Sequence, residues 1–100
     1  MHFNENQTRL WVNMINLVED FRFGKIRYSD MVYGLEGALD AGEFEDEYLI
    51  KQWYKFWLPL EIMSATPSDR TELKDVSESL SEMDLFLRNV ITSSTLPLPE

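Results

Sequence analysis

The feature that most constrains the fold is a C-terminal run of apolar residues whose spacing alternates between three and four. The run consists of Leu73, Val76, Leu80, Met83, Leu87 and Val90. Residues with this spacing occupy the a and d positions of a heptad and share one face of an α-helix. The run therefore predicts a helix that buries this face. Because it spans fewer than three full heptads, we favour packing within one chain over a coiled coil between two chains.

A first helix is expected from about Gln7 to Arg22, where apolar residues also recur at helical spacing. Gly24 follows at the position after the helix C-terminus, where glycine is preferred because it adopts a positive φ without strain. Lys25 and Arg27 lie in the connector that follows, which holds the only basic patch of the chain. In so acidic a chain we expect these cations, together with Arg22, to form internal salt bridges rather than to bind an anionic ligand.

A second helix is expected to begin after Ser29, a residue type that caps helix N-termini, and to end at residues 40–42. Gly34 and Gly37 each weaken this helix by up to about 1 kcal/mol relative to alanine. We therefore expect a neighbouring helix to approach closely at these two glycines.

A third helix, expected to begin near Glu45, is apolar on nearly every side between Tyr48 and Leu60. Such a helix lies at the centre of its domain or forms part of an interface. Pro59 lacks a backbone donor and is expected to kink the helix or to split it, with a further turn at residues 60–65. Two stripes run along this helix. We assign Trp53, Phe56 and Trp57 to the core, and Ile50, Tyr54 and Leu58 to an interface.

The chain shows no strand-like alternation beyond a short connector, so we predict an all-α fold, a four-helix up-and-down bundle. Its 100 residues suffice for one domain, which we place at residues 1–91, with a flexible tail at 92–100. The sequence contains no cysteine, no apolar run of membrane-spanning length and no signal-peptide pattern. We therefore expect a cytoplasmic protein that spans no membrane.

The charge of the chain is unevenly distributed. Between Tyr28 and Ile50 there are seven acidic residues and no Lys or Arg, in a chain whose formal net charge is −9. Such a segment attracts a basic protein surface. It does not suit nucleic acid or an anionic membrane, because neutralising phosphates requires clustered Lys and Arg.

Aromatic residues flank and interrupt this acidic segment, and aromatic side chains tend to dominate the binding energy of an interface. We expect the acidic residues to steer a basic partner and two tyrosines to anchor it. The predicted carboxylates are Asp40, Glu43, Glu45, Asp46 and Glu47, and the predicted anchors are Tyr48 and Tyr54.

Catalytic, metal and cofactor sites are not predicted. An EF-hand loop beginning at Asp40 would need oxygen ligands at its third and fifth positions, which a glycine and a phenylalanine occupy. The single histidine is His2, so a transition-metal site and a nucleophile–histidine pair both lack their usual residues. Glu36 and Glu61 have apolar neighbours, and we expect each to pair with Lys or Arg. The chain is therefore not expected to be an enzyme.

Residues 17–32, LVEDFRFGKIRYSDMV, combine a short amphipathic helix ending in Phe, a Gly-Lys-Ile turn and a Ser-capped second helix. This pattern resembles small bacterial immunity proteins of the colicin D type. The resemblance implies a small acidic helical protein that covers the active site of a basic toxin nuclease by mimicking its nucleic acid substrate. It covers sixteen of the 100 residues, and no binding residue is carried over from it. The alternative is a homo-oligomeric structural protein, in the simplest case a homodimer, built through the third helix or the fourth-helix seam.

Overall fold

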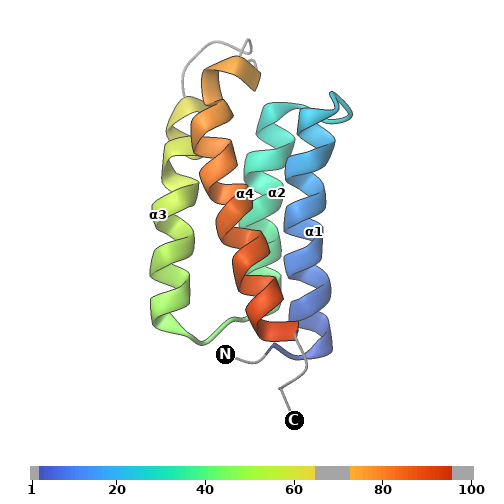
Figure 1. Ribbon diagram of the computed structural model, residues 1–100, viewed down its shortest axis with the longest axis vertical. Helices are drawn as coiled ribbons and strands as arrows, with labels where there is room; N and C mark the ends of the chain where they lie inside the picture. The colour runs from blue at the N-terminus through green and yellow to red at the C-terminus, as the bar shows by residue number, and fades with distance from the viewer. Residues whose placement is uncertain (1–2, 65–72, 96–100) are drawn as a thin grey trace.

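The computed structural model describes residues 3–64 and 73–95, which contain four helices. They are α1 (Glu5–Arg22), α2 (Tyr28–Gly42), α3 (Glu47–Ser64) and α4 (Leu73–Thr95). Consecutive helices run in opposite directions (Figure 1), and α1 and α3 each pack against both α2 and α4. The predicted all-α, up-and-down four-helix bundle is confirmed. Helix α4 continues to Thr95, past the end predicted at residue 91, and the remainder of the predicted tail lies outside the described residues.

Both ends of α1 are closed by local hydrogen bonds. The Asn4 side chain accepts from the Gln7 backbone N–H (2.7 Å) while the Gln7 side chain accepts from the Asn4 N–H (3.1 Å), so the helix begins two residues earlier than predicted. At the other end Gly24 has a φ of +75°, and the Lys25 N–H donates to the Asp20 carbonyl (2.8 Å). These bonds confirm the predicted role of Gly24 and fix the connection to α2.

The prediction that Ser29 caps α2 is wrong by two positions. Tyr28 is already helical, and Arg27 is the N-cap, its backbone N–H donating to the Asp30 carboxylate at 3.4 Å. Tyr28 is buried, and its hydroxyl donates to the Leu60 carbonyl of α3 at 2.6 Å. This tertiary contact favours a helical Tyr28, which the sequence pattern around Ser29 does not reveal.

Helix α3 begins at Glu47, two residues later than predicted, because Asp46 acts as its N-cap. The Asp46 carboxylate accepts from the Leu49 N–H at 3.0 Å. The helix continues through Pro59 to Ser64, so the alternative in which proline splits it is wrong. Pro59 is exposed, where water can reach the carbonyl left without its donor.

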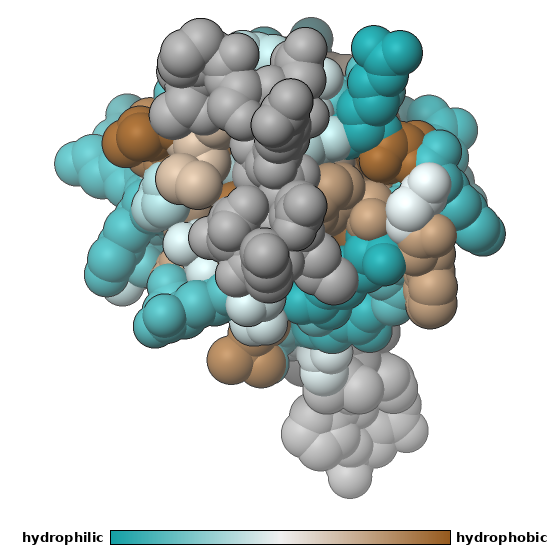
Figure 2. All heavy atoms as spheres, turned by 90° about the horizontal axis from the view of Figure 1, so that it is seen from above, coloured by the Kyte–Doolittle hydropathy of each residue, from teal (hydrophilic) through white to brown (hydrophobic). Residues whose placement is uncertain are grey.

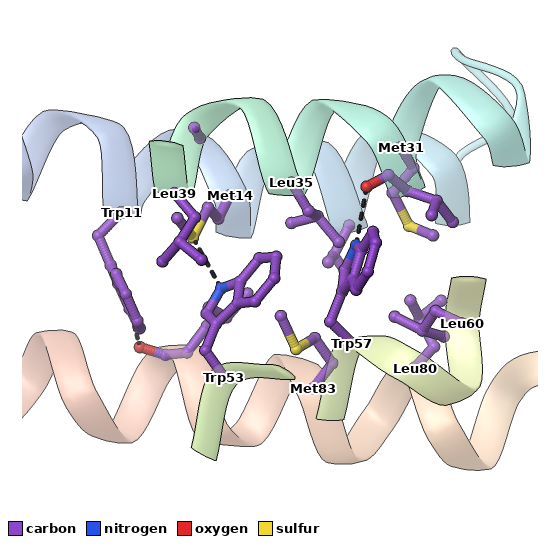
Figure 3. Close-up of a cluster of buried hydrophobic side chains, with 14 of the residues drawn as sticks. Trp11, Met14, Met31, Leu35, Leu39, Trp53, Trp57, Leu60, Leu80 and Met83 are labelled. Atoms are coloured by element: carbon purple, nitrogen blue, oxygen red, sulfur yellow. Dashed lines mark hydrogen bonds between the residues drawn. The ribbon is translucent and has the colours of Figure 1, made fainter. Parts of the chain in front are cut away.

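The apolar seam of α4 faces the interior of the bundle. Val76, Leu80, Met83 and Leu87 are at most 2 % exposed. In Figure 3 the side chains of Leu80 and Met83 point toward those of α2 and α3. The seam therefore packs within one chain, as favoured from its length.

Buried tryptophans connect the helices through hydrogen bonds as well as apolar contact (Figure 3). The Trp11 indole N–H donates to the Leu87 carbonyl at 2.8 Å, and that of Trp57 donates to the Val32 carbonyl at 2.9 Å. Because a buried donor without an acceptor costs about 1–3 kcal/mol, these bonds favour one alignment of each helix against its neighbour. Trp53 is fully buried too, so the assignment of Trp53 and Trp57 to the core is confirmed.

Close approach of α1 to α2 occurs at one of the two glycines for which it was predicted. A Cβ at Gly34 would lie 3.0 Å from Cδ1 of Leu17, whereas a Cβ at Gly37 would meet no described neighbouring atom within 4 Å. The prediction is confirmed for Gly34 and wrong for Gly37, which lies on the exposed side of α2.

Candidate protein-binding surface

The five carboxylates predicted to bind a partner gather at one end of the bundle, around the connection between α2 and α3 (bottom of Figure 1). All five side chains are exposed to solvent. This group is called the acidic end, and it consists of Asp40, Glu43, Glu45, Asp46 and Glu47. The placement follows from chain order, because the last turn of α2, the connection and the first residue of α3 are contiguous.

Phe44 packs the connection that carries the acidic end against the core. The Phe44 ring packs edge-on against Phe3 and Trp11, with ring centroids 5.1 and 5.4 Å away. Glu43 and Glu45 flank this half-buried ring and remain exposed. An anchored aromatic residue between two exposed carboxylates gives the acidic end a defined backbone.

Three ion pairs lie elsewhere, on α1 and α4. Arg22 pairs with Asp84 at 3.4 Å, and Arg88 pairs with both Asp84 (3.1 Å) and Glu19. Within residues 3–64 and 73–95, no member of the acidic end forms an ion pair. The internal salt bridge predicted for Arg22 is confirmed. The corresponding predictions for the connector cations Lys25 and Arg27 are wrong within the described residues, where neither forms an ion pair.

Glu43 has a backbone conformation that normally favours glycine. Its φ of 49° and ψ of 47° lie in the left-handed region, and it is the one non-glycine residue with a positive φ among those described. This conformation costs an ordinary L-residue roughly 1–2 kcal/mol. The chain therefore places a carboxylate where glycine would be less strained.

The two tyrosines predicted as anchors lie on different sides of α3. Tyr54 lies six positions after Tyr48, which corresponds to about 120° around an α-helix. Tyr48 is 66 % exposed, whereas Tyr54 is half-buried on the side that faces α2 and donates from its hydroxyl to the Glu36 carboxylate at 3.3 Å. Only Tyr48 therefore has the exposed ring that an anchor requires.

The contact between Tyr54 and Glu36 corrects the prediction that Glu36 pairs with Lys or Arg, because its described partner is a phenol. Burial raises the pKa of the Tyr54 phenol above its ordinary value, and the negative charges of Glu36 and Asp40 raise it further. Tyr33, which is 56 % exposed, lies near one turn before Glu36 on α2. Glu36 and Tyr33 were not included in the predicted binding surface. The spacing of residues 33, 36 and 40 nevertheless places all three on one face of α2.

A hollow of about 760 Å³ lies beside the acidic end, between the start of α1 and the connection of α2 to α3. Its apolar lining includes the rings of Phe3 and Phe44 and the side chain of Leu49. The side chains of Glu43 and Glu45, which are exposed, also border it. A hollow that combines the half-buried Phe44 with acidic side chains suits contact with a protein surface that is both apolar and basic.

Among the described residues, no group of three or more His, Cys, Asp or Glu side chains is placed to hold a metal ion. Within the same residues, no helix combines the length and apolarity needed to cross a bilayer. The acidic end presents exposed negative charge, and the exposed ring of Tyr48 lies next to it in the chain.

Comparison with family models, with curated proteins and with solved structures finds no match for this chain. The resemblance of residues 17–32 to immunity proteins stays a prediction, because no relative tests it.

Proposed function

We propose that this protein is a non-enzymatic binding module that recognises a basic protein through its acidic end, with Tyr48 as an aromatic anchor. The observation that carries the proposal is the set of exposed carboxylates that lack an ion pair within the described residues. Like charges held close together repel each other, and a bound cationic surface removes that repulsion. A basic partner would place cations opposite these carboxylates, an arrangement that Coulomb attraction favours.

Carboxylates and aromatic rings contribute differently to such an interface. Exposed charges mainly raise the rate of association, and their effect is screened over a Debye length of about 10 Å at 0.1 M salt. A buried aromatic ring contributes more to affinity, because interface hot spots are enriched in Tyr, Trp and Arg. We therefore assign steering to the acidic end and anchoring to Tyr48.

The strained backbone of Glu43 is further support. A non-glycine residue held in the left-handed region is a reason to ask what its side chain does. At Glu43 the side chain is an exposed carboxylate with no ion pair in the described structure, so folding does not obviously benefit from it. Binding a cationic partner would give this carboxylate a role.

The most concrete form of the proposal is an immunity-type inhibitor. The resemblance of residues 17–32 points to this class, and a formal net charge of −9 suits a protein that occupies a nucleic acid groove of a toxin nuclease. In that form, the acidic end would lie against the cationic residues with which the nuclease binds its substrate.

The first test is capture of partners from an extract of the host cell on the immobilised protein, at low and at high salt, with identification by mass spectrometry. We expect a basic protein to be retained in nearly stoichiometric amount at low salt and to be weakened at high salt. Recovery of the immobilised protein alone under both conditions would contradict the proposal.

A matched pair of variants then tests the surface. Glu43→Lys/Glu45→Lys reverses two charges of the acidic end, and Glu78→Lys/Glu82→Lys reverses two exposed charges of α4. Each variant has a formal net charge of −5, because each Glu→Lys replacement adds two charges to −9. In the captured complex, the first variant should slow association about tenfold or more and flatten its salt dependence. The second should change the rate much less, and equal losses would mean that net charge alone matters.

A second candidate function, a homo-oligomeric structural protein, is favoured by one observation on α3. Leu58 and Ile62 lie one turn apart and are 45 % and 64 % exposed, which leaves an apolar strip on the outer face of this helix. The α4 seam is buried inside the bundle, so of the two surfaces considered for self-association only that of α3 is left. Self-association that Leu58→Ser/Ile62→Ser abolishes, together with failure to capture a basic partner, would favour this function.

A further inference from the structure

The connection between α1 and α2 presents an apolar ring among cations. Phe23 is 75 % exposed, which makes it the most exposed large apolar side chain of the described residues. Lys25 and Arg27 are exposed on the same connection. Phe23, Lys25 and Arg27 are called the basic tip. Figure 2 looks onto this end of the bundle, where hydrophilic side chains surround separate apolar ones.

The backbone of the basic tip is held in place rather than left to vary. Gly24 takes up a φ of +75°, its N–H donates to the Phe21 carbonyl at 3.0 Å, and the Lys25 N–H donates to the Asp20 carbonyl at 2.8 Å. A rigid loop loses little conformational entropy when it binds. The backbone that carries the exposed Phe23 ring is therefore preorganised.

The hollow beside the acidic end has the complementary character. Its lining combines large apolar residues, of which the half-buried Phe44 is the most exposed, with the acidic residues Glu43, Glu45 and Asp46 and with polar residues at the start of α1. The basic tip and the hollow lie at opposite ends of the bundle (Figure 1), so they cannot meet within one chain.

We propose that the basic tip of one chain docks into the hollow of a second copy, head to tail. The Phe23 ring would pack against the half-buried Phe44, and Lys25 and Arg27 would approach Glu43 and Glu45. The contact joins two different surfaces, so a pair keeps one free hollow on one chain and one free tip on the other, and association continues into short open chains. The inference does not depend on the proposed function. Because it uses the same carboxylates, self-association would compete with a basic partner.

The net charge of −9 makes two copies repel each other, but this repulsion acts over long distances and salt screens it. The Debye length is about 10 Å at 0.1 M salt, whereas the 15 residues of α2 separate the two ends by about 22 Å. At this salt concentration each contact therefore responds mainly to its own local charges. These are Lys25 and Arg27 on the tip, with the exposed Asp30 beside them, and the carboxylates at the hollow. At 1 M salt the local attraction is screened as well.

The test is sedimentation velocity of the purified chain at 0.1 M and at 1 M NaCl, at protein concentrations up to 1 mM. A contact of this small size predicts a dissociation constant between about 10 μM and 1 mM. The weight-average sedimentation coefficient should rise with protein concentration at 0.1 M salt and rise much less at 1 M. A monomer at every concentration and both salt conditions would overturn the inference, whatever the outcome with a basic partner.

Two variants, each with one blocked end, make the test specific. Phe23→Ser/Lys25→Ser blocks the tip, and Glu43→Lys/Glu45→Lys blocks the hollow. All four positions are exposed, and circular dichroism checks that both variants keep the fold. Each variant alone should be monomeric at 1 mM.

An equimolar mixture of the two blocked variants retains one intact tip and one intact hollow. It should therefore form dimers and nothing larger. The control variant Glu78→Lys/Glu82→Lys should associate like the unaltered chain. Self-association of either blocked variant alone, or a mixture that stays monomeric, would overturn the head-to-tail contact.

Discussion

Replacement of Gly42 by alanine tests how the acidic end is held in place. A Cβ at Gly42 would lie 2.2 Å from Cε2 of Phe44, a separation at which the ring must move. The ring has little freedom to do so, because it packs against Phe3 and Trp11 with centroid distances of 5.1 and 5.4 Å. Gly42→Ala should therefore displace the anchor of the connection between α2 and α3.

Two opposing terms set the size of the effect. Alanine gains about 1 kcal/mol over glycine within a helix. Overpacking costs about 1–3 kcal/mol, and the displaced ring also loses part of aromatic contacts worth about 0.5–1.5 kcal/mol each. We expect Gly42→Ala to lower the free energy of unfolding by about 1–2 kcal/mol. For a domain of this size the melting temperature should fall by roughly 5–15 °C.

Gly37→Ala is the matched control on the same helix. A Cβ at Gly37 would meet no described neighbouring atom within 4 Å, so only the propensity term remains. This variant should raise the free energy of unfolding by about 0.4–1 kcal/mol. Urea unfolding followed by circular dichroism measures both variants under the same conditions.

A double-mutant cycle isolates the clash. In a Phe44→Ala background the obstructing ring is absent, so Gly42→Ala should become neutral or stabilising. If Gly42→Ala stabilises the otherwise unaltered chain as much as Gly37→Ala does, Phe44 is not packed against Gly42. The account of how the acidic end is anchored would then be refuted.

Three further substitutions have calculable directions. Glu43→Gly relieves the left-handed strain and should raise the free energy of unfolding in urea by about 0.5–1 kcal/mol, net of the greater freedom of unfolded glycine. Trp57→Phe leaves the Val32 carbonyl without its indole donor and should cost about 1–3 kcal/mol in the same assay; no loss would mean that the bond contributes nothing. Burial raises the pKa of Tyr28, so the folded chain binds this proton more tightly than the unfolded chain. Stability should fall as the pH rises beyond about 10, the unfolded value, and urea midpoints between pH 8 and 11 should show a smaller fall in Tyr28→Phe.

Helix number and identity were predictable because each helix buries a periodic apolar face. The α4 seam is the clearest case, since four of its residues are almost fully buried. Helix boundaries were less predictable, because contacts with other helices can decide whether a terminal residue becomes helical. Tyr28 joins α2 through its contact with Leu60, 32 positions further along the chain. Asp46 was placed inside α3, although its residue type also suits the capping position that it occupies.

The candidate surface was predictable where it depends on chain order and unpredictable where it depends on packing. The acidic end is nearly contiguous in sequence, so its carboxylates remain together in any helical fold. Tyr48 and Tyr54 lie on different sides of α3 because of helix geometry, and this could have been predicted from their spacing in the sequence. The bond between Tyr54 and Glu36 joins two helices, and the packing of Phe44 joins the connection to α1. Neither contact leaves a periodic signal in the sequence.

Local stability accounts for some carboxylates of the acidic end and not for others. Asp46 and Glu47 lie at the N-terminus of α3, where the helix dipole favours negative charge and where Asp46 caps a backbone N–H. Asp40 and Glu43 lie at the C-terminal end of α2, where the same dipole disfavours a carboxylate by about 0.3–1 kcal/mol, and Glu43 also has a strained backbone. Solubility does not require acidic residues at these two positions, because acidic residues at other exposed positions would serve it equally well. We therefore infer that any role of the acidic end in binding depends most on Asp40 and Glu43, whose charges oppose the stability of the helix that carries them.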